Sequence, residues 1–111
     1  MNVAIIFGGG VGARFSKDGT PKQFVELYNK PIIAYTLEAF SKNPSVDEIV
    51  IPCVSGWAEH LRAIIEQFRI NKRCHIVAGG ATSHESRLNA MRYINANFCG
   101  VQVVVLHDAV C

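Results

Sequence analysis

The architecture of this chain follows from residues 3–14, which read Val3-Ala4-Ile5-Ile6-Phe7-Gly8-Gly9-Gly10-Val11-Gly12-Ala13-Arg14. The first five are apolar and are followed by glycines, which predicts a short strand buried on both faces of a parallel sheet. The glycines allow backbone N–H groups to come close to a ligand, as they do where phosphates are bound. This order predicts a polyphosphate site at the mouth of an α/β sheet.

Two cations follow the strand at short range. Arg14 ends the glycine-rich segment, and Lys22 lies in the sequence Pro21-Lys22-Gln23-Phe24. Phosphoryl and nucleotidyl transfer spread negative charge over the oxygens around the reacting phosphorus, so fixed cations nearby lower the barrier. One forked guanidinium and one compact ammonium suit that task. We therefore expect Arg14 and Lys22 to act on the ligand rather than to be surface residues.

Outward from this stretch, strand-like and helix-like segments alternate. Further strands are expected at 48–54, 75–78 and 101–106, and helices at 31–40, 56–69 and 82–97. This alternation predicts an α/β fold, a Rossmann-like and mostly parallel sheet with helices on both faces and right-handed crossovers. If the strand order is 3-2-1-4, the first and fourth strands are neighbours.

The same pattern predicts the helix ends and the faces that meet the core. Pro31 is expected in the first turn of the first helix, and Ser55 as the N-cap of the second. Thr82 and Glu85 are spaced as a capping box for the third. The apolar residues expected toward the core are Ile32, Tyr35, Leu37, Phe40, Trp57, Leu61, Ile64, Ile65, Phe68, Leu88, Met91 and Ile94.

Sheet topology brings distant residues to one edge. Ligands of such sheets bind outside the carboxyl ends of the strands, where the strand order reverses. With the first and fourth strands adjacent, Asp108 comes to lie beside the glycine-rich segment, and Gly79-Gly80 opens from the same edge. An aspartate that follows a strand can hold Mg²⁺, although it can equally cap a helix. Three sequence signals thus converge on one predicted pocket.

Length and composition limit the class of protein. The 111 residues form a single domain, or part of one, and half of them are hydrophobic. A formal net charge of +2 does not suggest binding to nucleic acid or membrane. Four cysteines without a C-x-x-C pair are expected to be free thiols in a reducing cytoplasm. The sequence stops just after the last predicted strand, so an uncovered apolar edge and a longer protein, or a partner, are expected.

Other phosphate-binding loops fit less well. Gly8-x-Gly10-x-x-Ala13 satisfies the relaxed dinucleotide fingerprint, but the second predicted strand ends near Val54 without the acidic residue that would hold a ribose. A Walker A loop would end in G-K-[ST], whereas this one ends in Arg14. A tight glycine turn without a ligand is the structural alternative. A nicotinamide-binding module therefore stays only as an alternative function.

The ordered motifs resemble those of cytidylyltransferases of the 2-C-methyl-D-erythritol 4-phosphate and D-ribitol 5-phosphate type. The matching segments span the whole chain and are the glycine-rich residues 8–14, Thr20-Pro21-Lys22-Gln23-Phe24, Lys30-Pro31-Ile32-Ile33, Gly79-Gly80 with Ser86, and His107-Asp108-Ala109-Val110. The resemblance implies that CTP and a polyol phosphate react, with Mg²⁺, to give a CDP-polyol and pyrophosphate. It also implies a homodimer in the full-length form.

The resemblance assigns roles to individual residues. Arg14 and Lys22 would stabilise the transition state, and Asp108 would be a metal ligand. Backbone amides of Gly8, Gly9, Gly10 and Gly12 would hold the triphosphate. The segment that contains Gly80, Ala81, Thr82 and Ser86 would contact the cytosine and ribose.

Details of the motifs favour D-ribitol 5-phosphate as the acceptor. Gly9-Gly10, Ser55-Gly56-Trp57 and the valine after His107-Asp108-Ala109 are similar to that branch, with methylerythritol phosphate as the alternative. Two departures from the family pattern also stand out. Ala81-Thr82-Ser83 occupies the segment where the family has an arginine, and Cys111 replaces another arginine. A non-catalytic nucleotide-binding remnant is therefore a further alternative.

Overall fold

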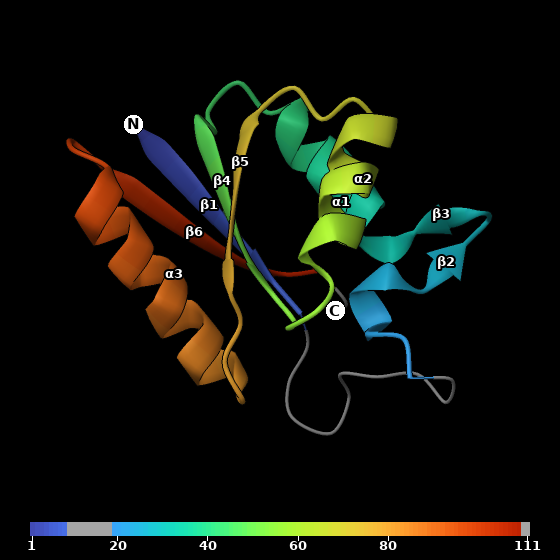
Figure 1. Ribbon diagram of the computed structural model, residues 1–111. Helices are drawn as coiled ribbons and strands as arrows, with labels where there is room; N and C mark the ends of the chain where they lie inside the picture. The colour runs from blue at the N-terminus through green and yellow to red at the C-terminus, as the bar shows by residue number, and fades with distance from the viewer. Residues whose placement is uncertain (9–18, 110–111) are drawn as a thin grey trace.

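The computed structural model describes residues 1–8 and 19–109. Its centre is a four-stranded sheet built from β1 (Asn2–Phe7), β4 (Glu48–Cys53), β5 (Arg73–Ala78) and β6 (Val103–Asp108). The strand order is β5-β4-β1-β6, and all pairings are parallel (Figure 1). The predicted 3-2-1-4 order is therefore confirmed.

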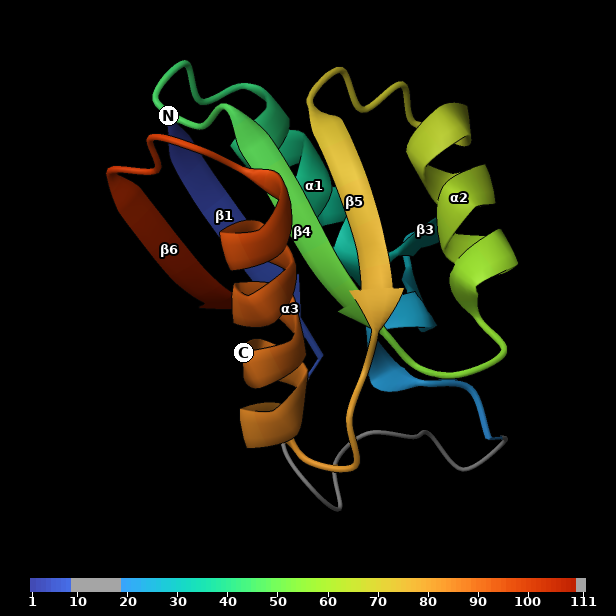
Figure 2. The same ribbon diagram turned by 60° about the vertical axis from the view of Figure 1, so that its left-hand side comes forward.

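Helices cover both faces of the sheet, as predicted. α1 (Ile32–Ser41) and α2 (Ala58–Gln67) pack on one face, and α3 (Ser83–Asn97) packs on the other (Figure 2). Because side chains alternate along a strand, β1 contributes to two cores. Ala4 and Ile6 lie in the core under α1 and α2, whereas Val3 and Ile5 lie in the core under α3.

Between β1 and α1 the chain forms small elements that the sequence pattern did not predict. These are the 3-10 helix η1 (Lys22–Phe24) and a hairpin of two short strands, β2 (Glu26–Leu27) and β3 (Lys30–Pro31). The hairpin turn is Tyr28-Asn29, and both residues have positive φ angles of 55° and 63°. This turn was missed because its usual signal, a glycine after asparagine or aspartate, is absent.

Helix starts agree with the predictions only in part. The Thr82 Oγ1 accepts a hydrogen bond from the Glu85 N–H at 3.1 Å, so the predicted cap of α3 is confirmed. Ser55 does not cap α2, because the helix begins later, with Trp57 at the N-cap and no side-chain cap bond. Pro31 is itself the N-cap of α1 rather than a residue of its first turn.

Most predicted core residues of the helices are buried or half-buried, but three are exposed instead: Tyr35, Leu88 and Met91. α3 buries Ser86, Ala90 and Ile94, which are four residues apart and form one ridge against the sheet. The spacing of apolar residues predicts a helix. Packing against the sheet then determines which of two neighbouring rows of side chains is buried. The small residues Ser86 and Ala90 allow the closer contact.

The outer strand β6 has no fully buried residue. Val103, Val105 and Leu106 are 49%, 39% and 50% exposed. Strands of parallel sheets are normally covered on both faces. The predicted uncovered apolar surface at this edge of the sheet is therefore confirmed.

Two further findings concern the chain as described. Cys53, Cys74 and Cys99 are free thiols, in agreement with the prediction, while Cys111 lies outside the described residues. None of the helices in residues 1–8 and 19–109 combines the length and the apolar character needed to cross a membrane.

Candidate functional site

The carboxyl edge of the sheet joins the first and last strands of the chain. Phe7 and Asp108 are register partners across β1 and β6, and the Ala109 N–H donates to the Phe7 carbonyl at 2.8 Å. Gly8, the next residue of the chain, therefore lies beside Asp108. The sequence placed Asp108 after the strand, but it is the last residue of β6, so the strand itself fixes its position.

The Pro21–Phe24 segment returns to the same edge. Backbone bonds from the Phe24 N–H to the Pro21 carbonyl, 2.9 Å, and from the Val25 N–H to the Lys22 carbonyl, 3.1 Å, close η1. The Phe24 ring stacks on Trp57 with centroids 5.1 Å apart, which attaches η1 to the start of α2. Lys22 is half-buried in this turn. Lys22, the predicted cation, is thus held near the end of β1 by a turn that packs against α2.

Gly8 and Gln23 are in close contact. A Cβ placed on Gly8 would lie 2.8 Å from Gln23 Oε1 and 3.0 Å from Nε2. Only glycine therefore fits at this position while the carboxamide stays where it is. The sequence pattern assigned Gly8 to phosphate binding. The structure gives a second reason for a glycine at this position, which is the close approach of the Gln23 side chain.

The loop from β5 to α3 lies at the same end of the sheet as the carboxyl end of β1 (Figures 1 and 2). Its backbone N–H groups donate within the chain, from Gly79 to the Cys53 carbonyl at 2.8 Å and from Gly80 to Ser86 Oγ at 2.9 Å. The Ala81 N–H donates to Glu85 Oε2, also at 2.8 Å. These three N–H groups already donate hydrogen bonds within the chain. A ligand at this loop would therefore contact the carbonyl groups and side chains of the loop.

α3 holds this loop in shape. A Cβ on Gly80 would overlap Glu85 Cβ, so this glycine is required by the close approach of the helix. Asn89 Nδ2 donates to the Ala78 carbonyl at 3.0 Å and ties the end of β5 to the same helix. Glu85 and Asn89 were not predicted as site residues. The sequence signal that could have identified Glu85 and Asn89 was their helical spacing relative to each other and to Ser86.

The predicted site residues divide into two groups. Gly8, Lys22, Gly80, Ala81, Thr82, Ser86 and Asp108 are described by the structure and belong to segments at the carboxyl edge. Gly9, Gly10, Gly12 and Arg14 lie outside the described residues. Their assignments remain predictions.

The donor set at this edge fits a magnesium ion that is shared with phosphates. Within residues 1–8 and 19–109 no group of three His, Cys, Asp or Glu side chains could hold a metal. Mg²⁺ in nucleotide sites needs only one or two carboxylates, because phosphate oxygens and waters supply the remaining ligands. Asp108, fixed at the end of β6 beside Gly8, is a carboxylate of this kind.

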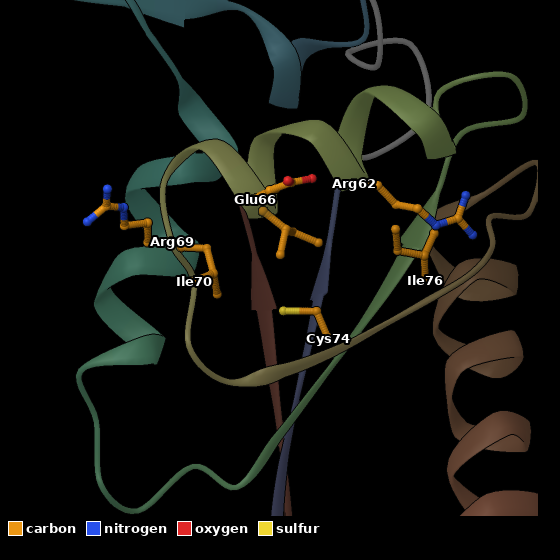
Figure 3. Close-up of a pocket in the computed structure, with 7 residues that line it drawn as sticks. Arg62, Glu66, Arg69, Ile70, Cys74 and Ile76 are labelled. Carbon is orange, nitrogen blue, oxygen red and sulfur yellow. The ribbon is translucent and has the colours of Figure 1, made fainter.

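A separate cavity of about 450 Å³ lies between α2 and β5 (Figure 3). Cys74 points into it from β5, and the guanidinium groups of Arg62 and Arg69 point away from each other at its rim. Burial, together with the nearby Glu48 carboxylate, raises the pKa of the Cys74 thiol to about 11. This thiol is therefore a poor nucleophile, and no predicted site residue lines the cavity.

Comparisons of the sequence and the fold with known proteins give consistent matches. Residues 2–111 match the family described as IspD: 2-C-methyl-D-erythritol 4-phosphate cytidylyltransferase. A ribitol-5-phosphate cytidylyltransferase of Vibrio parahaemolyticus is 47% identical over 110 residues, which are 99% of this chain and 46% of that protein. One from Streptococcus agalactiae is 37% identical over the same shares of the two chains.

A solved structure shares the fold. The crystal structure of 4-diphosphocytidyl-2C-methyl-D-erythritol synthase from Anaerococcus prevotii superposes with a TM-score of 0.73 at 22% identity. The match covers 99% of this chain and 43% of that one. The chain thus spans about half the length of the curated relatives and of the solved structure that it matches.

Proposed function

Because this chain belongs to the 2-C-methyl-D-erythritol 4-phosphate cytidylyltransferase family, we propose that it forms the CTP-binding part of a ribitol-5-phosphate cytidylyltransferase. The observation that carries the proposal is the pairing of Phe7 with Asp108, which brings this aspartate beside the start of the glycine-rich segment. Lys22 is held near the same edge by η1. A carboxylate, a cation and glycine amides are the groups that a metal-bound triphosphate needs.

In the proposed reaction an oxygen of the polyol phosphate attacks the α-phosphorus of CTP. The bond from that phosphorus to the oxygen bridging to the β-phosphate breaks, and pyrophosphate leaves. The Lys22 ammonium, and by prediction the Arg14 guanidinium, stabilise the negative charge that builds on the phosphorus oxygens. Asp108 would hold Mg²⁺, which when bound neutralises phosphate charge.

The loop at Gly80–Ser86 is proposed to contact the cytosine and ribose. Since the Gly80 and Ala81 N–H groups donate to Ser86 and Glu85, the loop has a fixed shape before the ligand arrives. A fixed loop loses less conformational freedom on binding. A homodimer and a cytoplasmic location remain predictions.

The acceptor distinguishes the two branches of the family, because both are expected to use CTP. The ribitol assignment follows the curated relatives, which are 37% and 47% identical to this chain. Methylerythritol phosphate is the second candidate, favoured by the description of the matching family. Turnover assays of the full-length protein with each acceptor would separate the two.

Calorimetric titration of CTP with and without Mg²⁺ tests nucleotide binding. We expect saturable binding that requires Mg²⁺ and weakens about tenfold or more in Lys22→Ala, since a charge-assisted contact is lost. Lys42→Ala is the matched control, because Lys42 is exposed at the end of α1. Absence of CTP binding by the parent chain, or tighter binding of NADPH than of CTP, would refute the proposal.

A further inference from the structure

Lys22 lies between two buried residues of the turn that carries it. Pro21 before it is fully buried, and Phe24 after it is 4% exposed. Lys22 itself is half-buried, in the first position of η1. A 3-10 helix of three residues is too short to be stable by itself. The position of Lys22 therefore depends on how Pro21 and Phe24 pack against the rest of the protein.

Phe24 packs on an aromatic cluster at the start of α2. Its ring is stacked on that of Trp57, with centroids 5.1 Å apart, and the His60 ring meets both of these rings edge-on at 5.1 Å from each. Stacked and edge-to-face pairs are favoured arrangements of aromatic rings. Trp57 and His60 are three residues apart, so the first turn of the helix presents both rings to Phe24.

Trp57 is itself fixed by the sheet and by α2. Its N–H donates to the Val54 carbonyl at 3.1 Å, just after the end of β4, and its carbonyl accepts a hydrogen bond from the N–H of the fully buried Leu61 at 3.0 Å. The Trp57 side chain also packs against the core under α1 and α2. The short turn at η1 therefore packs on a ring that the larger elements of the fold hold in place.

We propose that Trp57 is a positioning residue for Lys22: its ring holds Phe24, and through Phe24 it holds the turn that presents the Lys22 ammonium group to the phosphates of CTP. This inference rests on the proposed function, because it takes Lys22 as the cation that binds those phosphates. A cation that is already in place loses less conformational freedom when the ligand binds. Trp57 thus raises the affinity for the nucleotide without contacting it.

A double-mutant cycle in the full-length protein tests the inference, by calorimetric titration of CTP in the presence of Mg²⁺. We expect Trp57→Leu to weaken CTP binding about three- to tenfold, since the turn loses its stacking partner. In the Lys22→Ala background the same substitution should change the affinity by less than about twofold, because its effect passes through Lys22. Trp57→Phe keeps an aromatic ring and should restore most of the affinity.

Phe98→Leu is the matched control. Phe98 is a half-buried aromatic residue on the other face of the sheet, where its ring contacts those of His75 and Tyr93. This substitution should lower the melting temperature, as Trp57→Leu does, and leave CTP binding unchanged. The comparison therefore separates a loss of packing in general from a loss of position at Lys22.

The outcomes are separable. A lower melting temperature with unchanged CTP affinity in Trp57→Leu overturns the inference and identifies a residue that serves packing alone. Equal weakening by Trp57→Leu in the parent and Lys22→Ala backgrounds, or equal weakening by Phe98→Leu, also overturns it. If the parent binds CTP and Lys22→Ala binds it equally well, the positioning role fails while nucleotide binding stands. A parent that does not bind CTP refutes the proposed function itself.

Discussion

Phe7 and Asp108 face each other across the pair β1–β6, although they lie at opposite ends of the sequence. The pairing places Asp108 next to Gly8, and the Ala109 N–H donates to the Phe7 carbonyl at 2.8 Å, which fixes the backbone just after Asp108. The edge of the sheet thus brings a potential metal ligand to the first glycine of the glycine-rich segment. The proposed chemistry of the site depends on this arrangement.

Asp108→Asn should weaken Mg²⁺-dependent CTP binding by about tenfold or more, because a neutral amide is a poor ligand for a hard cation. Titration of Mg²⁺ at fixed CTP, followed by calorimetry, measures the change. Asp47→Asn is the control, since Asp47 accepts a 2.7 Å hydrogen bond from the Asn2 N–H at the opposite edge and an amide oxygen can still accept it. Equal Mg²⁺ dependence in the two variants would exclude Asp108 as the ligand.

Gly80→Ala should destabilise the chain by about 1–3 kcal/mol, the usual cost of overpacking. The added methyl group would overlap Glu85 Cβ, and Glu85 cannot simply rotate away because the overlap is with its Cβ and its backbone lies in α3. Urea unfolding measures the loss. Gly56→Asn is the control, because Gly56 has open space around it and a φ of 87°, which asparagine tolerates better than other residues. An unchanged Gly80→Ala variant would show that α3 is not fixed against the loop.

The sheet could be predicted from the sequence because its signals are local and strong. Four short apolar segments alternate with three helical ones, and short connections leave few arrangements for a parallel sheet. The convergence of Gly8, Gly80 and Asp108 on one edge followed from that order alone. The proximity of residues that are far apart in the sequence could therefore be predicted wherever the strand order alone determines it.

Other features depend on contacts that periodicity does not encode. Leu88 and Met91 have helical spacing but are exposed, and the smaller Ser86 and Ala90 are the buried residues of α3, with Ile94. The hairpin turn at Tyr28 uses residues without a turn signature. The close approach of the Gln23 carboxamide to Gly8 is likewise a tertiary contact that no spacing pattern encodes.

Tyr93→Phe should lower the free energy of unfolding by about 1 kcal/mol, the value of a hydrogen bond lost from a half-buried site. The Tyr93 hydroxyl lies 2.9 Å from His75 Nδ1, and His75 Nε2 lies 2.6 Å from the buried Glu48 carboxylate. This network joins α3 to β5 and β4 at the amino edge of the sheet. Tyr28→Phe is the matched control, because that side chain is 89% exposed. Equal unfolding curves for the two variants would show that the network adds nothing to stability.

The cysteines should differ in their reaction with iodoacetamide. Burial raises the pKa of Cys53 and of Cys74 from the ordinary 9.0 to about 11. At pH 8 a thiol with that pKa is about 0.1% thiolate, the reactive form. Exposed Cys99 should therefore be modified before Cys53 and Cys74, and modification of these two should accelerate about tenfold per pH unit until the pH approaches 11. Peptide mapping by mass spectrometry after timed quenching measures each site separately.

The same shifts predict how alkaline pH affects stability. A pKa raised in the folded state means that folding favours the protonated thiol, so the contribution is complete below pH 9 and is lost as the pH rises toward 11. Cys53→Ala and Cys74→Ala should each flatten the decline of the melting temperature over that window, relative to Cys99→Ala. Early modification of Cys74 at pH 8 would show that the cavity between α2 and β5 gives its thiol more solvent than the structure does.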